Sequence, residues 1–199
     1  MPARLPAAGR RRQLLDAARG AFAEKGFHAT SMDEVAGAAG VTKPVIYQHF
    51  GSKRQLFLEL LGDVGSELRD TIAKASRNAI GPRARVEAGF AAYLRFVSED
   101  RASFRLLFAG GTLRDEEFAK AAMQAEQAMA ETIASMIDAD ISLEHRLLLA
   151  HAITGMADGV SRHWVANQPG LSPEELAGLV TDLAWAGLRG IPAAVVEPG

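Results

Sequence analysis

The stretch between residues 30 and 53, TSMDEVAGAAGVTKPVIYQHFGSK, constrains the fold of this chain more than any other feature of its sequence. Ser31 is a preferred residue at the start of a helix, and Glu34 lies three positions later, so the two can form a capping box. Gly40 follows the apolar stripe of this first helix and can end it, because glycine tolerates a positive φ. Pro44 suits the first turn of a second helix. The stretch therefore predicts two short helices joined by a tight turn, with a third helix following at once.

The second of these helices is expected to have two different sides, and Thr42 can cap its start. Ile46 and Phe50 fall on the side that faces a core. The outward side holds Lys43, Val45, Tyr47, Gln48 and His49. A capped pair of amphipathic helices of this kind is a helix-turn-helix, whose second helix enters the major groove of DNA. The sequence thus predicts a DNA-binding protein.

The longer segment GFHATSMDEVAGAAGVTKPVIYQHFGSKRQLF resembles the DNA-binding domain of the TetR family of bacterial transcriptional regulators. The residues that carry the resemblance are Gly26-Phe27, the turn from Ala38 to Val41, Tyr47, His49-Phe50 and Ser52-Lys53. They cover about the first third of the chain, and beyond it the likeness is one of size and helical composition. The resemblance implies a ligand-responsive transcriptional regulator, in the first instance a repressor.

Charge is distributed unevenly along the chain. Its net charge is −2, but residues 1–56 hold nine Lys and Arg against four Asp and Glu, whereas the remainder holds 13 against 20. The basic part coincides with the helix-turn-helix, as binding to phosphates requires. The absence of cysteine is compatible with the cytoplasm. No apolar run is long enough to cross a bilayer, so we expect a cytoplasmic protein with no membrane partner.

The remaining pattern is helical throughout, so the predicted fold is all-α with about nine helices. A three-helix DNA-binding domain is expected over residues 1–56, and a larger helical domain for ligand binding and dimerisation over residues 57–199. Further helices are expected to begin at Ser52, after Gly81-Pro82, near Phe104, at Asp115, at Leu143 and after Ser172. The first helix is expected to run from about Arg10 to Lys25 and to end at Gly26.

The candidate DNA-binding residues are Ser31, Thr42, Lys43, Pro44, Val45, Tyr47, Gln48, His49 and Lys53. Lys43 can donate to guanine O6 or N7, or else to a phosphate. Pro44 and Val45 can contact a thymine methyl, although helix-start preference explains Pro44 equally well.

Tyr47 and His49 match family positions that hold the DNA backbone, with a half-buried core ring as the alternative for Tyr47. Gln48 can read adenine or bind phosphate, and Lys53 can hold a phosphate at the start of its helix. The basic residues 10–12 are interpreted as part of a mobile arm near phosphates or as a tail without contacts.

Family members bind near-palindromic operators as two-fold dimers, so the resemblance implies a homodimer on double-stranded DNA. The candidate interface residues, on the last two expected helices, are Gly155, Gly159, Trp164, Ala184 and Gly187. The two glycines four positions apart would allow close helix approach. The alternative for Gly155 and Gly159 is packing within one subunit, and for Trp164 it is an ordinary core position.

The resemblance also implies a pocket for a small apolar ligand in the second domain. The candidate ligand-binding residues are Phe90, Tyr93, Phe104, Phe108, Met123, Gln127 and Met156, with a plain helical core as the alternative. VTKPVIYQHFGSK, the FRLLF run at 104–108 and WAGL near the end are similar to actinobacterial regulators of fatty-acid synthesis that bind long-chain acyl-CoA. That branch implies a fatty acyl-CoA ligand and, as an alternative to repression, activation of lipid genes.

An enzyme is the rival class of function. The five histidines lack the spacing of a helical zinc motif, and neither a phosphate-cradling glycine loop nor a nucleophile elbow occurs. We therefore expect no catalytic residue, metal or cofactor. A helical ligand-binding or adaptor protein that does not bind specific DNA is a third possibility, but it leaves the basic helix-turn-helix unexplained.

Overall fold

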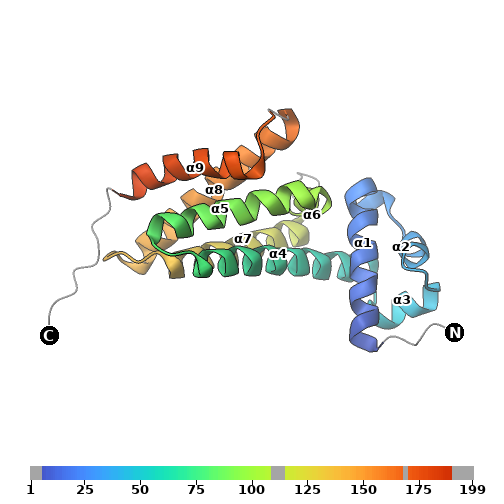
Figure 1. Cartoon of the computed structure of the whole chain (residues 1–199). Helices are drawn as coiled ribbons and strands as arrows, with labels where there is room; N and C mark the ends of the chain where they lie inside the picture. Colours follow the sequence, from blue (N-terminus) through green and yellow to red (C-terminus); the bar gives the residue numbers. More distant parts are fainter. Residues whose placement is uncertain (1–5, 109–114, 168–169, 190–199) are drawn as a thin grey trace. The chain divides into compact units, whose positions relative to one another are not determined.

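The computed structural model describes residues 6–108, 115–167 and 170–189, and within these ranges every regular element is an α-helix. The helices are α1 (Ala7–Ala29), α2 (Met32–Ala38), α3 (Lys43–His49), α4 (Lys53–Asn78), α5 (Pro82–Glu99), α6 (Arg101–Phe108), α7 (Glu116–Met136), α8 (Leu143–Asn167) and α9 (Pro173–Leu188) (Figure 1). The predicted all-α fold of nine helices is confirmed.

The chain forms two compact units. Unit 1 comprises residues 1–64 and 101–123, and unit 2 comprises residues 65–100 and 124–199. These units are defined by packing, whereas the boundary predicted after residue 56 separates functions and stays a prediction. None of the helices described combines the length and apolar character that crossing a membrane requires.

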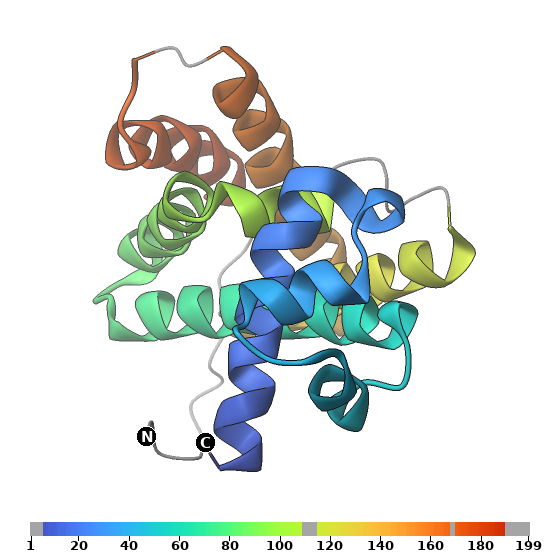
Figure 2. The same ribbon diagram turned by 90° about the vertical axis from the view of Figure 1, so that its right-hand side faces the viewer.

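Figure 2 shows α2 and α3 as two short helices, and the predicted capping box and glycine turn of this helix-turn-helix both form. The backbone N–H of Ser31 donates to Glu34 Oε2 at 2.7 Å, and the N–H of Glu34 donates to Ser31 Oγ at 3.2 Å, so the capping box is complete. Gly40 has φ 66°, the left-handed conformation that glycine adopts without strain. Thr42 occupies the cap position of α3, but its side chain makes no capping hydrogen bond, so its predicted capping role is wrong.

Helix α1 differs from its predicted bounds. It begins at Ala7 and continues to Ala29, three residues beyond Gly26. Gly26 itself leaves the helical conformation, with φ 77° and ψ 171°, so the axis breaks where the sequence predicts an end. One further turn follows the break because residues 27–29 return to helical geometry.

Unit 1 is built around the inner sides of α1 to α4. Ile46 and Phe50 are completely buried, as predicted. Four aromatic rings of unit 1 also pack together, with centroids 5.0 Å apart for Phe22 and Phe57 and 4.7 Å apart for both Phe27–Phe118 and Phe57–Phe118. These rings join α1 and α4 to the first turns of α7, and they fix the frame on which α2 and α3 sit.

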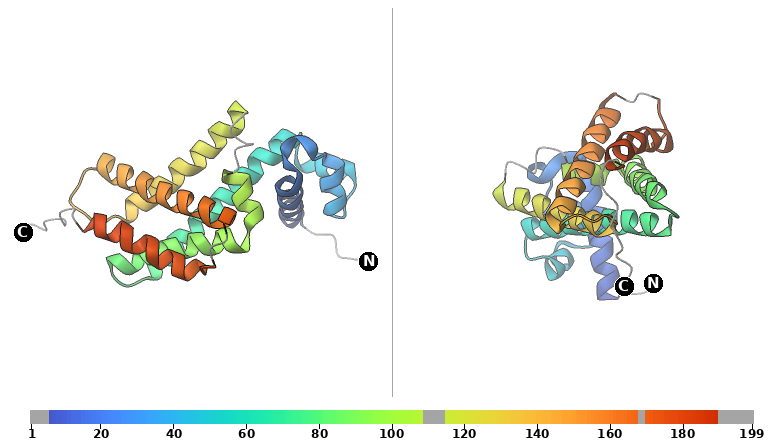
Figure 3. Two further views of the ribbon diagram at one scale, coloured as in Figure 1. Left: turned by 90° about the horizontal axis from the view of Figure 1, so that it is seen from above. Right: turned by 90° about the vertical axis from the view of Figure 1, so that its left-hand side faces the viewer.

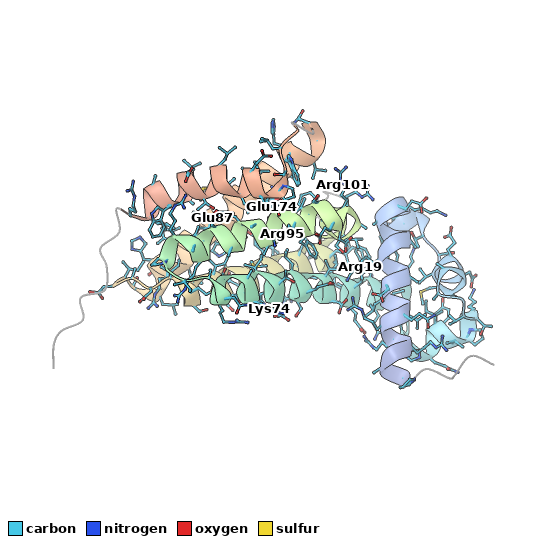
Figure 4. All side chains as sticks on the ribbon, in the orientation of Figure 1. Arg19, Lys74, Glu87, Arg95, Arg101 and Glu174 are labelled. Atoms are coloured by element: carbon cyan, nitrogen blue, oxygen red, sulfur yellow. The ribbon has the colours of Figure 1, made fainter. Side chains whose placement is uncertain are left out.

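In unit 2, α9 packs along α5 (Figures 1 and 3). The buried side of α9 consists of Leu176, Ala177, Val180, Thr181 and Ala184. Two ion pairs link the helices outside this apolar contact: Arg95 Nε lies 2.7 Å from Glu174 Oε1 (Figure 4), and Arg83 Nη2 lies 2.6 Å from Asp182 Oδ1. A capping box between Ser172 and Glu175 starts α9, with the same arrangement as that of α2.

Candidate functional site

The outer side of α3 is open to solvent. Lys43, Pro44, Tyr47 and Gln48 are exposed, whereas Ile46 on the opposite side is buried. Val45 and His49 are partly exposed. Tyr47 keeps 43% of its surface accessible, so it is partly covered and partly open to solvent. This side of α3 therefore presents a group of hydrogen-bonding and apolar side chains of the kind that read and hold a duplex.

Lys43 does not stand alone on this surface. Its Nζ lies 2.9 Å from Oδ2 of Asp33 on α2, and the hydrogen bond to this carboxylate raises the pKa of Lys43. Asp33 was not among the candidate residues. The only sequence signal for it is an acidic side chain in the first turn of α2, which the helix dipole explains equally well.

Lys53 has a different set of partners from the predicted phosphate. Its Nζ donates to the carbonyl oxygens of Phe27 and Thr30, each at 2.8 Å, and of His28 at 3.3 Å. It also lies 4.5 Å from the centroid of the Phe27 ring. An ammonium has three donors, so these carbonyls occupy them. Lys53 thus fastens the start of α4 to the segment that follows the Gly26 break, and its contact with a phosphate stays a prediction.

The mobile-arm interpretation is wrong for residues 10–12, because they lie inside α1. Arg11 forms an ion pair with Glu59, and its guanidinium lies 4.8 Å above the Phe50 ring. Arg12 pairs with Asp16 and Asp63, each at 3.0 Å. Much of the positive charge of α1 is thus matched by carboxylates within unit 1. Residues 1–5 of the expected arm lie outside the described part.

The candidate ligand-binding residues are divided between the units. Phe90, Tyr93, Gln127 and Met156 belong to unit 2, whereas Phe104 and Met123 belong to unit 1. Phe90, Tyr93 and Phe104 are buried, but Met123 is 59% exposed. The side chain of Phe108 lies outside the described residues. Gln127 Oε1 lies 3.3 Å from Nε2 of His151 on α8, which joins α7 to α8.

A polar group lies inside unit 2 between α5 and α8. Tyr93 is 4% exposed, and burial followed by the nearby charge of Asp158 raises its pKa, while Ser161 opposes the rise. Burial also raises the pKa of Asp158, against the opposing effect of Arg162, with which it forms an ion pair. Ser161 is fully buried. These side chains place hydrogen-bond donors and an acceptor inside unit 2.

The candidate interface residues fall on different sides of their helices. Gly155, Gly159 and Gly187 are exposed. Ala184 is only 3% exposed, because it belongs to the buried side of α9, so its assignment to an interface is wrong. The Trp164 ring is half-buried, and its indole N–H donates to the carbonyl oxygen of Leu171 at 3.0 Å.

Three leucines on α8 and α9 that were not among the candidate interface residues are exposed in the single chain. Leu148, Leu179 and Leu183 are 67%, 59% and 67% exposed. With the exposed small residues they form one stripe on each helix, at spacings of three or four that place residues on the same side. We define these residues as the apolar stripe: Leu148, Ala152, Gly155 and Gly159 on α8, with Leu179, Leu183 and Gly187 on α9.

The glycines of the apolar stripe are not explained by packing within the chain. A Cβ added at Gly155, Gly159 or Gly187 would meet no atom within 4 Å among the described residues. The alternative of close packing inside one subunit is therefore wrong for these positions. Within the same ranges no group of three or more metal-ligating side chains occurs.

Comparison with known proteins covers most of the chain. The family model "Bacterial regulatory proteins, tetR family" matches residues 14–60, and "Tetracyclin repressor-like, C-terminal domain" matches residues 82–187. The HTH-type transcriptional activator FasR of Mycolicibacterium smegmatis is 33% identical over 191 residues, which are 95% of this chain and 87% of FasR. The HTH-type transcriptional regulator BetI of Rhizobium meliloti is 28% identical over 183 residues, 90% of each chain.

Solved structures give the same answer for the fold. A TetR-like transcriptional regulator from Rhodococcus sp. RHA1 has a TM-score of 0.74 at 30% identity, and the match covers 94% of this chain and 100% of that one. The regulator FadR from Bacillus subtilis, in complex with stearoyl-CoA, has a TM-score of 0.75 at 18% identity, over 88% and 98% of the two chains. At 18% identity this second likeness concerns the fold alone.

Proposed function

Since this chain belongs to the TetR family of bacterial transcriptional regulators, we propose that it binds a near-palindromic operator as a homodimer and releases or engages it in response to a fatty acyl ligand. The chain is a DNA-binding regulator and not an enzyme. The operator, the residues that read it, the dimer contacts and the ligand are the proposed parts. Because a bacterial regulator binds chromosomal DNA, we also propose that the protein acts in the cytoplasm.

The exposed outer side of α3 is the observation that carries the DNA-binding part of the proposal. Lys43, Tyr47 and Gln48 project from it, while buried Ile46 anchors the helix from behind. In this proposal Tyr47 and His49 hold phosphates, whereas Lys43, Pro44, Val45 and Gln48 face base edges. Ser31 and Thr42 lie at the starts of α2 and α3, where their hydroxyls can meet the backbone of the DNA.

The apolar stripe supports the dimer. Three leucines that remain more than half exposed cost free energy in water, and covering each contributes about 1.5–3 kcal/mol. The small residues between them leave room for a second helix to approach closely. A two-fold dimer through α8 and α9 would pair one recognition helix with each half-site, about 34–36 Å apart.

The ligand part of the proposal rests on three supports. The sequence resembles regulators that bind long-chain acyl-CoA, FadR shares the fold and was solved with stearoyl-CoA, and unit 2 contains the polar group of Tyr93, Asp158 and Ser161 beside apolar core. An acyl chain requires apolar surroundings, and its polar end requires hydrogen-bonding partners. We therefore place an acyl-CoA in unit 2, with Phe90, Tyr93, Gln127 and Met156 as its candidate neighbours.

Control would pass through α4, because this helix runs from unit 1 into unit 2. A ligand that shifts α4 would change the separation of the two recognition helices in the dimer, and a mismatch of a few ångströms breaks the contacts of one half-site. Such a ligand must bind one of the two states more tightly than the other.

Activation is the second candidate for the direction of regulation. FasR, which is 33% identical over 95% of this chain, is named a transcriptional activator. Transcription in vitro from a promoter that carries the bound sequence separates the two directions. A rise in transcript with added protein supports activation, and a fall supports repression.

Selection of bound sequences from random duplex DNA, with purified full-length protein, tests the DNA-binding proposal. We expect a near-palindrome with two half-sites. Recovery of a single half-site would contradict the dimer, and enrichment of no sequence by a folded protein would contradict sequence-specific binding.

The ligand proposal is tested on the selected DNA. Stearoyl-CoA is expected to shift the DNA affinity by about tenfold, within the range typical of coupled sites, while free coenzyme A at the same concentration leaves it unchanged. Equal effects of the two compounds would show that the acyl chain is not recognised. An unchanged affinity with both would contradict a stearoyl-CoA ligand without touching the DNA-binding proposal.

A further inference from the structure

An ion pair joins α2 and α3 on the surface that the proposed function turns toward DNA, and the inference below rests on that function. Lys43 is the first residue of α3, and its Nζ lies 2.9 Å from Asp33 Oδ2. The two side chains keep 57% and 60% of their surfaces exposed, so both groups remain accessible to a duplex. A carboxylate is unexpected here, because every phosphate of the DNA repels it.

The local structure of α2 does not require Asp33. The other acid of that first turn, Glu34, completes the capping box with Ser31 and also binds Lys25 Nζ at 2.6 Å. Glu34 therefore has a structural explanation. Asp33 takes no part in the cap, and the partner that the structure gives it is Lys43, ten residues further along the chain.

We propose that Asp33 is a specificity-determining residue, which keeps Lys43 from phosphates and directs the pair to a G·C base pair. A lysine without an acidic neighbour binds the nearest phosphate, and that contact strengthens binding to every sequence alike. With Asp33 beside it, an approaching phosphate meets a negative charge as well as a positive one. An uncharged base edge meets no such repulsion.

The chemistry of the pair selects the base pair. In the major groove guanine offers two acceptors, N7 and O6, and its cytosine partner offers the N4 amino group as a donor. Lys43 supplies donors and Asp33 supplies an acceptor. The two groups are held side by side on adjoining helices, so together they match the donor and acceptor pattern of G·C.

The test compares Asp33→Asn, Lys43→Ala and the double variant with the wild-type chain. Each protein is used for selection from random duplex DNA, and its affinity for the selected sequence and for a scrambled duplex is measured between roughly 50 and 200 mM salt. Asp70→Asn is the matched control, because Asp70 is an exposed aspartate of α4 in unit 2 and its replacement changes the net charge equally. Asp33→Glu keeps the charge.

For Asp33→Asn we expect tighter binding to the scrambled duplex and a steeper salt dependence, by about 0.9 in the slope of log K against log salt for each half-site. The preference for G·C at one position of each half-site should fall about tenfold, since one good base contact discriminates by roughly that factor. Lys43→Ala and the double variant should lose this preference alike. Asp33→Glu should keep it, and Asp70→Asn should leave preference and slope as in the wild type.

Two results would overturn the proposal. One is an Asp33→Asn variant that keeps both the wild-type preference and slope, or that differs from the wild type only as Asp70→Asn does. The other is uniformly weaker binding to both duplexes at an unchanged slope, which would mean that Asp33 merely supports the fold. If the wild-type chain enriches no sequence at all, sequence-specific binding itself fails and this inference fails with it.

Discussion

Two exposed surfaces of this regulator differ in the chemistry of the side chains that they present to water. On the outer side of α3 the exposed lysine is paired with a carboxylate, and the exposed aromatic carries a hydroxyl. On the apolar stripe of α8 and α9, leucines and glycines stand open without any polar partner. The polar groups of the first surface are paired or hydrated in the free protein, so this surface suits a partner that is bound reversibly. The second is satisfied only when another apolar surface covers it, which favours a lasting contact.

The largest effect on either surface is expected from a charge placed in the apolar stripe. Leu183→Glu should weaken the dimer by on the order of 100-fold or more, because burying an unpaired carboxylate is costly, and operator binding should be lost with it. Sedimentation and binding to the selected DNA measure the two effects. Leu143→Glu is the control, since Leu143 is also exposed but lies on the other side of α8.

Gly159→Phe keeps this test independent of folding. A Cβ at position 159 meets no atom within 4 Å among the described residues and Gly159 is exposed, so we expect the monomer to fold normally, whereas a close partner helix would clash with the ring. A folded Gly159→Phe variant that still dimerises as tightly as the wild type would place the dimer contact elsewhere.

On the polar surface, Tyr47→Phe tests the contact with the DNA backbone. Loss of one hydrogen bond to a phosphate should weaken binding by about 1 kcal/mol, or roughly fivefold, on the selected and the scrambled DNA alike. The chain has one other tyrosine, so Tyr93→Phe is the control and should leave the affinity of the ligand-free protein unchanged. A loss confined to the selected sequence would instead make Tyr47 a base-reading residue.

The two capping boxes sharpen the comparison between the units. Ser31→Ala and Ser172→Ala each remove the hydroxyl that accepts from the backbone N–H of the glutamate three residues later, and each should lower the free energy of unfolding by about 1 kcal/mol. Chemical denaturation measures both. Only Ser31→Ala should also weaken DNA binding, because α2 positions α3. Equal loss of DNA binding in the two variants would contradict this division of roles.

The smallest expected effect concerns the acids of these boxes. The hydrogen bond from Lys25 and then those from Ser31 lower the pKa of Glu34 from 4.5 to about 2. The pKa of Glu175 is lowered by hydrogen bonds from Ser172 alone. A lowered pKa in the folded state stabilises the fold above pH 4.5, and this contribution is lost as the pH falls toward 2. Lys25→Met should raise the pKa of Glu34 toward that of Glu175, which carbon NMR of the carboxyl groups detects. An unchanged value would show that Lys25 does not hold Glu34 in solution.

Local signals in the sequence were sufficient for the number and order of the helices, although not for the bounds of α1. The box of Ser31 and Glu34, the turn at Gly40 and the buried positions Ile46 and Phe50 all follow from residues within one or two turns of each other. The resemblance to the family predicted, in addition, the fold class and the type of function. Short-range rules determine such features because their partners are neighbours along the chain.

The partners of the charged side chains, in contrast, were decided by tertiary structure. Lys53 reaches carbonyls of residues 27–30, and Arg12 meets Asp63, 51 positions away. Ala184 turned out to be buried because α5 covers that side of α9, a fact that the helical period alone cannot supply. The sequence by itself determined which elements form and what kind of regulator they build. Only the tertiary structure decided which charged side chains form ion pairs, because folding brings their partners together from distant positions in the chain.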